Sequence, residues 1–290
     1  MKKTKYFIQA CFVYALYFVF RILPLPIASA LGGMLGQVVG RFMKSSQTAL
    51  KNLDDVFPDK TLVEKQRIIK DMWNNLGRVF SEYPHLKTIA TNHVTTINQN
   101  ILDNAQNSPK SVIYMGGHIA NWEIGGAISI VKYGDPLRLV YRAPNNPWVA
   151  RLLSRMRSID KEIDYIEKSK TGGRQLVKAL QNREDIAILI DQKYNEGIPV
   201  PFFGRDAMTS PAVIQLAQKF DCLIVPVRII RLKGSHFEFE ASQPLTLYDD
   251  NGAPLPATQV LTEMHGHLEA WITQHPEQWL WIHRRWPNNA

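Results

Sequence analysis

The chain has little cysteine, and too few charged residues for a disordered protein. Two of its 290 residues are cysteines, Cys11 and Cys222, and they lie far apart in the sequence. A disulfide framework and a cysteine metal site are therefore not expected, and both side chains are interpreted as small buried hydrophobic groups in a reducing compartment. Hydrophobic residues make up 45% of the chain and charged residues 21%, which suits one large globular domain with a small appendage.

Three familiar motifs are missing, and each absence argues against a class of function. There is no His-Glu-x-x-His pattern, so no metal site is expected, and no Gly-x-Ser-x-Gly pattern, which argues against an ordinary serine hydrolase. No recognised nucleic-acid module occurs, and basic residues are mixed with acidic ones, so nucleic acid is not an expected partner. The net charge of +8 still suits an anionic membrane surface, a phosphorylated lipid or an acidic protein. A basic peripheral membrane protein without enzymatic activity stays open as an alternative.

Apolar sequence dominates residues 1–43, which we interpret as a membrane anchor joined to a domain of residues 44–290. A basic leader precedes residues 6–20, which carry no charge, and residues 22–40 are again uncharged. The first run is short for a membrane-spanning helix, which needs about 20 residues, and no cleavage site closes it. One spanning helix and a helix pair dipping into one leaflet both fit this pattern. The basic leader favours a cytoplasmic N-terminus.

Two further patterns concern the helices around and after this anchor. Gly32, Gly36 and Gly40 repeat at four-residue spacing, which suits either close packing of a second helix or a flexible segment. Thr61 and Glu64 form the pattern of a capping box, which predicts the start of a long amphipathic helix.

From about residue 110 onward, predicted strands alternate with predicted helices. This order predicts an α/β domain with a largely parallel sheet flanked by helices, because parallel strands need crossover connections. The predicted strands cover residues 111–115, 137–141, 186–190, 223–230 and 237–241, and the predicted helices cover residues 120–132, 148–157, 173–181, 211–220 and 257–273.

A glycine-rich turn carries the clearest chemical pattern. Gly116, Gly117 and His118 follow a predicted strand, and the carboxyl end of a parallel strand is where α/β sheets place their sites. His118 and Glu123 would differ by about 140° around one continuous helix, so they meet only if His118 precedes the helix and folds back over it. Glu123 would then hold one imidazole nitrogen while the other takes a proton from an alcohol. The spacing alone also suits a capping histidine and a solvated acid.

The His-x-x-x-x-Glu pattern at residues 118–123 resembles the catalytic motif of the lysophospholipid acyltransferase superfamily. Most of that superfamily has Asp at the last position, whereas Glu preceded by Trp is similar to the late acyltransferases of lipid A biosynthesis, the lauroyl and myristoyl transferases. Other stretches match that branch in the same order and cover nearly the whole chain. They are residues 51–53, 57–58, 141–147, 191–192 and 200–204, Thr209, Pro226, Arg228 and residues 275–286.

The resemblance implies an acyl transfer at the cytoplasmic face of the bacterial inner membrane. Acyl carrier protein or acyl-CoA would deliver a fatty acyl thioester as co-substrate, and no cofactor is implied. The acceptor would be a hydroxyl of an anionic phosphorylated glycolipid, a lipid A precursor. His118 would deprotonate that hydroxyl, and Glu123 would orient His118. The resemblance leaves open the acyl chain length and the hydroxyl that is acylated.

Five further residues are predicted to bind substrate. Gly117 and Asn121 belong to the motif, and glycine backbone amides or a nearby arginine are candidate donors to the oxyanion. Arg142 ends a predicted strand, where it would either clamp an anionic group or close the loop. Asp191 and Gln192 follow another predicted strand, so a parallel sheet places them on the same rim as His118.

Several segments have two interpretations from sequence alone. The arginines of the predicted helix 148–157 suit either lipid phosphates and carrier-protein acids or a solvated face. Residues 200–204 suit either an acyl tunnel or the core, and the tryptophans of residues 279–286 suit either an interfacial belt or the core. Two other functions also fit the same motif: an acyltransferase for another glycolipid, such as a mannosylated phosphoinositide, and a thioesterase that uses water.

Overall fold

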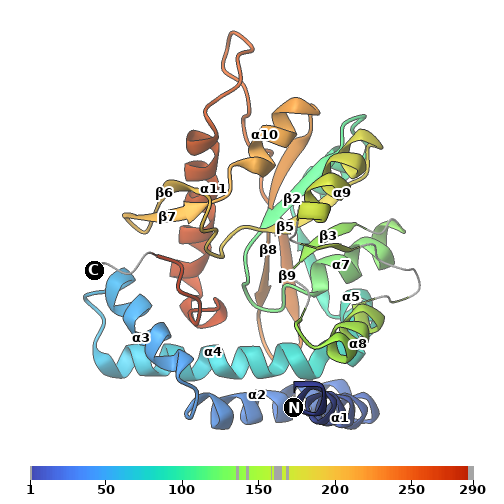
Figure 1. Ribbon diagram of the computed structural model, residues 1–290, viewed down its shortest axis with the longest axis vertical. Coiled ribbons are helices and arrows are strands. Elements are labelled where there is room, and N and C mark those ends of the chain that lie inside the picture. Colours follow the sequence, from blue (N-terminus) through green and yellow to red (C-terminus); the bar gives the residue numbers. More distant parts are fainter. Residues whose placement is uncertain are drawn as a thin grey trace.

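The computed structural model describes residues 2–134, 137–141, 144–157, 159, 165–167 and 170–286. A central sheet carries helices on both sides, and the N-terminal helices form a layer across one end of it (Figure 1). The helices are α1 (Lys2–Ile22), α2 (Leu25–Gly40), α3 (Ser45–Val56), α4 (Leu62–Glu82), η1 (Tyr83–His85), α5 (Leu86–Asn92), α6 (Gln99–Gln106), α7 (Ile124–Ile128), η2 (Ser129–Tyr133), α8 (Pro147–Arg157), α9 (Lys170–Gln181), α10 (Ala212–Lys219), α11 (Ala257–Gln274) and η3 (Pro276–Gln278). The strands are β1 (Val94–Ile97), β2 (Val112–Gly116), β3 (Arg138–Tyr141), β4 (Tyr165–Glu167), β5 (Ile186–Leu189), β6 (Ile198–Phe202), β7 (Arg205–Thr209), β8 (Leu223–Arg231) and β9 (Phe237–Ala241).

The main sheet has seven strands in the order β1-β9-β8-β2-β5-β3-β4. The five strands from β8 to β4 are parallel, whereas β9 is antiparallel to β8 and pairs in parallel with β1 at the edge. The prediction of an α/β fold with a largely parallel sheet flanked by helices is therefore confirmed. Because β2 and β5 are parallel neighbours that pair Gly116 with Leu189, the residues that follow both strands meet at one edge.

α2 packs closely against α4 through glycine. A Cβ atom on Gly32 would lie 2.6 Å from the carbonyl oxygen of Gly77, and one on Gly36 would lie 2.2 Å from the carbonyl oxygen of Trp73. A Cβ on Gly40 would likewise meet the Trp73 ring, at 2.2 Å. The glycine spacing therefore serves close helix packing. The capping box that begins α4 is also confirmed, since Thr61 and Glu64 make both of its hydrogen bonds.

α1 is mostly exposed and lies beside α8. Among the described residues, Lys3–Ile22 is the one helical segment long and apolar enough to cross a membrane. Near its start it contacts α8 and the turn before it, where Asn146 Nδ2 donates to the backbone oxygen of Tyr6 at 2.7 Å and the rings of Phe7 and Trp148 meet edge to face at 6.2 Å. Near its end it contacts η1, where His85 Nε2 lies 2.9 Å from the backbone oxygen of Phe20. α1 and α2 thus differ, because one face of α2 is buried against α4, whereas only a small part of α1 is buried.

Three local expectations need correction or resolution. The helix predicted over residues 120–132 begins only at Ile124, because Ala120 adopts a left-handed φ of 49° and keeps residues 120–123 in a turn. Cys11 is exposed, whereas Cys222 is buried as expected. The open interpretations of the apolar segments resolve toward the core: Val200 and Phe202 have no exposed surface, and the tryptophans of residues 279–286 are all buried.

Candidate active site

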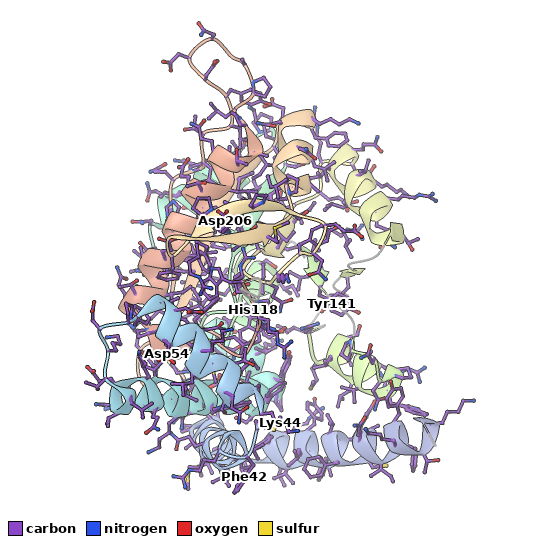
Figure 2. The ribbon with its side chains drawn as sticks, turned by 60° about the vertical axis from the view of Figure 1, so that its left-hand side comes forward. Phe42, Lys44, Asp54, His118, Tyr141 and Asp206 are labelled. Carbon is purple, nitrogen blue, oxygen red and sulfur yellow. The ribbon has the colours of Figure 1, made fainter. Side chains whose placement is uncertain are left out.

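His118 is paired with Asp191 at the carboxyl ends of β2 and β5. The Nδ1 atom of His118 lies 2.7 Å from Oδ1 of Asp191, and the backbone amide of His118 donates to Oδ2 of the same carboxylate at 2.7 Å. Figure 2 shows His118 near the middle of the molecule, above Lys44 and Phe42, which lie in the turn between α2 and α3. The sequence rule that placed both residues on one rim is borne out by these contacts, whereas their direct pairing was not anticipated.

Asp191 is buried and held as a carboxylate. Trp279 Nε1 donates to its Oδ2 at 2.8 Å, which adds to the two contacts from His118. Burial opposes the charged form, but the neighbouring His118 and the hydrogen bonds outweigh it and lower the pKa of Asp191 below its usual range. A carboxylate in this state fixes His118 with a proton on Nδ1 and leaves Nε2 as the nitrogen able to accept one.

Nε2 of His118 lies close to the side-chain amide of Gln192. The side-chain amide nitrogen of Gln192 lies 3.2 Å from His118 Nε2 and 3.3 Å from Nε2 of His283. Two of the residues predicted to bind substrate, Asp191 and Gln192, therefore surround the imidazole. His283 was missed as a site residue, although it lies in the C-terminal stretch that carries the family resemblance.

Glu123 has a different partner from the one predicted. Arg157 of α8 donates from Nη2 to Glu123 Oε1 at 2.5 Å and from Nε to Oε2 at 2.6 Å, and Trp122 Nε1 donates to Oε1 at 3.0 Å. Burial disfavours both charges, but their mutual attraction lowers the pKa of Glu123 and raises that of Arg157. The expected hydrogen bond from Glu123 to His118 is thus corrected: Asp191 holds the imidazole, and Glu123 holds Arg157. The same pair corrects the solvated-face interpretation for Arg157.

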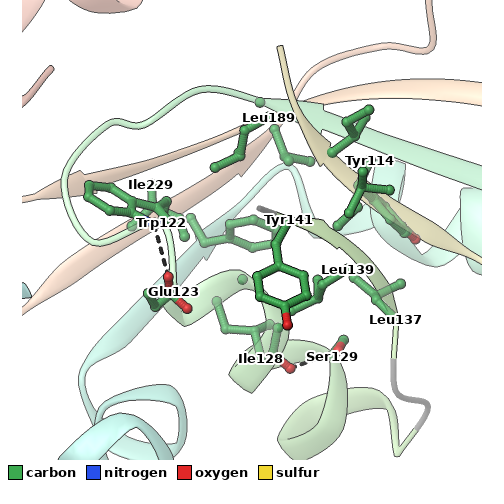
Figure 3. Close-up of a pocket in the computed structure, with 18 of the residues that line it drawn as sticks. Tyr114, Trp122, Glu123, Ile128, Ser129, Leu137, Leu139, Tyr141, Leu189 and Ile229 are labelled. Carbon is green, nitrogen blue, oxygen red and sulfur yellow. Dashed lines mark hydrogen bonds between the residues drawn. The ribbon is translucent and has the colours of Figure 1, made fainter. Parts of the chain in front are cut away.

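A largely apolar cavity of about 250 Å³ has His118 in its lining. Residues of β2, β5, β8, α7 and η2 line it, and so do Asp185 and Gln192, which lie before and after β5. In Figure 3, Leu189 lies above the cavity and Ile128 below it, with Tyr141 in front. Glu123 and Arg157 also line it, together with side chains of β2, β5 and β8. The apolar lining suits an apolar chain whose reactive end lies at His118.

Both glycines before His118 are sterically required. A Cβ on Gly117 would lie 2.8 Å from a methyl group of Leu268, and one on Gly116 would lie 2.8 Å from the carbonyl oxygen of Val227. Gly117 also lines the cavity. Larger residues here would move the turn that carries His118.

Two predicted substrate-binding residues remain, Asn121 and Arg142, and Asn121 is not among the residues that line the cavity. Asn121 has no exposed surface, and its Nδ2 donates to Oε2 of Glu82 at 2.8 Å. The structure thus gives Asn121 a contact that holds the turn and not an open position beside a substrate. Arg142 lies outside the described residues. Among those that are described, no group of three or more His, Cys, Asp or Glu side chains is arranged to hold a metal ion.

Comparison with known proteins adds a family. The family described as bacterial lipid A biosynthesis acyltransferase matches residues 1–288. The lipid A biosynthesis palmitoleoyltransferase of Escherichia coli is 26% identical over 276 residues, which are 91% of this chain and 86% of that protein. The lipid A biosynthesis lauroyltransferase of the same organism is 26% identical over 278 residues, with the same coverage of 91% and 86%. A solved structure, the 1-acyl-sn-glycerophosphate acyltransferase of Thermotoga maritima, aligns with a TM-score of 0.40 and 9% identity over 84% of this chain and 97% of that one.

Proposed function

Because this chain belongs to the bacterial lipid A biosynthesis acyltransferase family, we propose that it moves a fatty acyl chain from an acyl carrier protein thioester to a hydroxyl of a lipid A precursor. The observation that carries the proposal is His118, which is oriented by Asp191 and lines an apolar cavity. The pair supplies a general base, and the cavity supplies a place for the acyl chain. Acyl-CoA would present the same thioester and is the alternative donor.

The proposed reaction needs no nucleophilic side chain. His118 Nε2 takes the proton of the acceptor hydroxyl, whose oxygen attacks the thioester carbonyl and forms a tetrahedral oxyanion. The oxyanion then collapses, the carbon–sulfur bond breaks, and the proton on His118 passes to the departing thiolate. Asp191 stabilises the imidazolium between the two steps.

Arg157 is the proposed donor to the oxyanion. It lines the same cavity as His118, and Glu123 fixes its guanidinium through two hydrogen bonds. The backbone amide of His118 already donates to Asp191, so it is engaged elsewhere. Glu123 then acts on the reaction through Arg157, which gives the Glu of the His-x-x-x-x-Glu motif a role without contact to the histidine.

The test is a transfer assay with purified protein, an acyl carrier protein thioester and a phosphorylated, acylated glucosamine disaccharide, read by mass spectrometry. The wild type should add one acyl chain to the disaccharide, and His118→Ala should slow transfer by about 10²–10⁴-fold. His275→Ala, which removes a partly exposed histidine that contacts Glu277, is the matched control and should keep full activity. Free fatty acid as the sole product would mean a thioesterase, and an active His118→Ala would refute the proposed base.

Variants of Asp191 and Glu123 show which of these two carboxylates orients His118. Asp191→Asn keeps the shape but allows the imidazole the wrong tautomer, so kcat should fall by about 10²–10⁴-fold. Glu123→Gln should lower kcat less, since it weakens the hold on Arg157 and leaves His118 in place. If Glu123→Gln proved the more damaging change while Asp191→Asn stayed fully active, the sequence-based pairing of His118 with Glu123 would be right instead.

Residues 1–43 are the proposed membrane attachment, with the catalytic domain at the cytoplasmic face of the inner membrane. The exposed apolar surface of α1 and its basic leader support this proposal. Deleting Lys2–Ile22, which leaves α2 packed on α4, should release much of the protein from sedimented membranes. A folded truncated protein that stays wholly in the pellet would place the attachment elsewhere.

A further inference from the structure

A buried carboxylate at the end of α4 joins three distant parts of the chain. Glu82 has no exposed surface, and its two oxygens accept four hydrogen bonds. Arg231 of β8 donates to them from Nη1 at 2.6 Å and Nη2 at 3.0 Å, Ser29 Oγ of α2 donates at 2.7 Å, and Asn121 Nδ2 of the turn after His118 donates at 2.8 Å. A buried charge is costly unless it is paired and hydrogen-bonded, and this one is both.

The turn whose Asn121 donates to Glu82 is strained. Ala120 adopts a left-handed φ of 49°, which is unfavourable for a residue with a Cβ. Asn75 Nδ2 donates to the carbonyl oxygen of Ala120 at 3.0 Å, and the amide of Ala120 donates to the carbonyl oxygen of Gln278 at 2.9 Å. Arg231 Nε in turn donates to Asn75 Oδ1 at 2.9 Å. The pair of Glu82 and Arg231 therefore supports the turn from two sides.

The third partner lies on the helix next to the proposed anchor. Ser29 is fully buried on α2, and Arg78 Nη1 also donates to its Oγ at 2.9 Å. The outer side of α2 is apolar and exposed at Ile27, Met34 and Val38, which suits contact with lipid. Movement of α2 away from α4 would remove a hydrogen bond from Glu82 and open the buried charge to water.

We propose that Glu82 is a positioning residue, which fixes the turn carrying His118 through Asn121 and couples that turn to the seating of α2 through Ser29. Glu82 is not among the residues that line the cavity and does not contact His118, so it acts only through its partners. The inference rests on the proposed function only in that His118 is the reacting base. The consequence is that turnover depends on α2 being packed against α4.

The first test exchanges the two polar groups across the contact. Asn121→Asp sets two carboxylates 2.8 Å apart in a buried site, and kcat should fall at least about 10-fold with little change in KM. Adding Glu82→Gln restores a hydrogen bond of opposite direction and a single negative charge, so the double variant should be faster than Asn121→Asp alone. If Glu82 only neutralises Arg231, the double variant will be no faster than Asn121→Asp alone, which would overturn the proposal.

The second test removes the link to α2. Ser29→Ala should lower kcat about 3–10-fold at constant KM and constant sedimentation with membranes, because one hydrogen bond to Glu82 is lost. Ser81→Ala is the matched control, since Ser81 is a fully buried serine of the same helix interface whose hydroxyl bonds to the carbonyl oxygen of Arg78. Equal kcat values for Ser29→Ala and the wild type would refute the coupling, and this test decides the matter if Asn121→Asp does not fold.

In both tests, two rates are measured for each variant: acyl transfer to the acceptor and hydrolysis of the thioester by water. A wild type that hydrolyses the thioester without transferring it would overturn the proposed acceptor, while the effect of Glu82 on kcat would still be measured. An active wild type with unaffected variants would overturn the role of Glu82 alone.

Discussion

His265 is a buried histidine whose surroundings require its neutral form. Its Nδ1 lies 2.7 Å from the carbonyl oxygen of Pro201, so Nδ1 carries the proton, and its Nε2 accepts from Arg285 Nη2 at 3.2 Å. Burial is the main cause that lowers the pKa of His265 to about 4, and the charge of Arg285 adds to it. Between pH 6.5 and 4 the unfolded chain therefore binds more protons than the native protein, and stability falls as the pH falls through that range.

The predicted loss from this one residue is about 2 kcal/mol of unfolding free energy between pH 7 and pH 5. Denaturant unfolding at pH 7, 6 and 5 measures it, and His265→Gln should show a flatter dependence, by up to about 1.4 kcal/mol per pH unit. Parallel pH dependences for the wild type and His265→Gln would show that the imidazole titrates alike in both states.

At the residue scale, the sequence predicts where the site residues lie in the sheet better than it predicts which side chains they bind. His118, Asp191 and Gln192 follow neighbouring parallel strands, and the strand-end rule brings them together. The partner of Glu123 could not be predicted, because Arg157 comes from the end of a helix that no spacing relates to the turn. The left-handed Ala120 was also unpredictable, since its conformation is held by Asn75 and Gln278 from elsewhere in the chain.

At the element scale, α7 sets the width of the cavity through its glycines. Gly125 lines the cavity, and a Cβ added to it would find its nearest neighbour, a methyl group of Ile229, at 3.9 Å. Gly125→Leu should therefore fold and shorten the space for an acyl chain. Each methylene that no longer fits loses about 0.8 kcal/mol, or about 4-fold in kcat/KM for a longer donor relative to a shorter one.

A series of acyl thioesters of increasing length measures this shift as a ratio of kcat/KM values. Gly173→Leu is the control, because Gly173 lies on α9 with no atom near its Cβ position and should leave the ratio unchanged. An unchanged ratio in folded Gly125→Leu would place the acyl chain outside this cavity.

Long, regular elements were predictable from sequence, and short or irregular ones were not. The strands that became β2, β5, β8 and β9 and the helices that became α8 and α11 follow clear periodicity or apolar runs. β1 and β4 have only four and three residues, and the hairpin of β6 and β7 contains prolines in a strand, so propensity gave no signal for them. The glycine spacing in α2 suited either close helix packing or a flexible segment. Spacing alone does not identify a partner helix, so the packing against α4 could not be predicted.

At the scale of the whole molecule, the layer of N-terminal helices, which we propose to face the membrane, and the sheet that carries His118 are joined by buried hydrogen bonds. α2 is seated on α4, and α4 holds the turn of His118 through Asn75 and Glu82. The division at residue 43 is predicted from composition and stays a prediction. The turn that carries His118 is thereby linked to the helices that we propose to meet the lipid.

The most direct measurement is mass spectrometry of lipid A from the source bacterium with and without this gene. The account predicts that lipid A from the strain lacking the gene is lighter by one acyl chain. Re-introducing the wild-type gene should restore the chain, and re-introducing His118→Ala at equal protein abundance should not. Lipid A of unchanged mass in the strain lacking the gene, or full restoration by His118→Ala, would contradict the account.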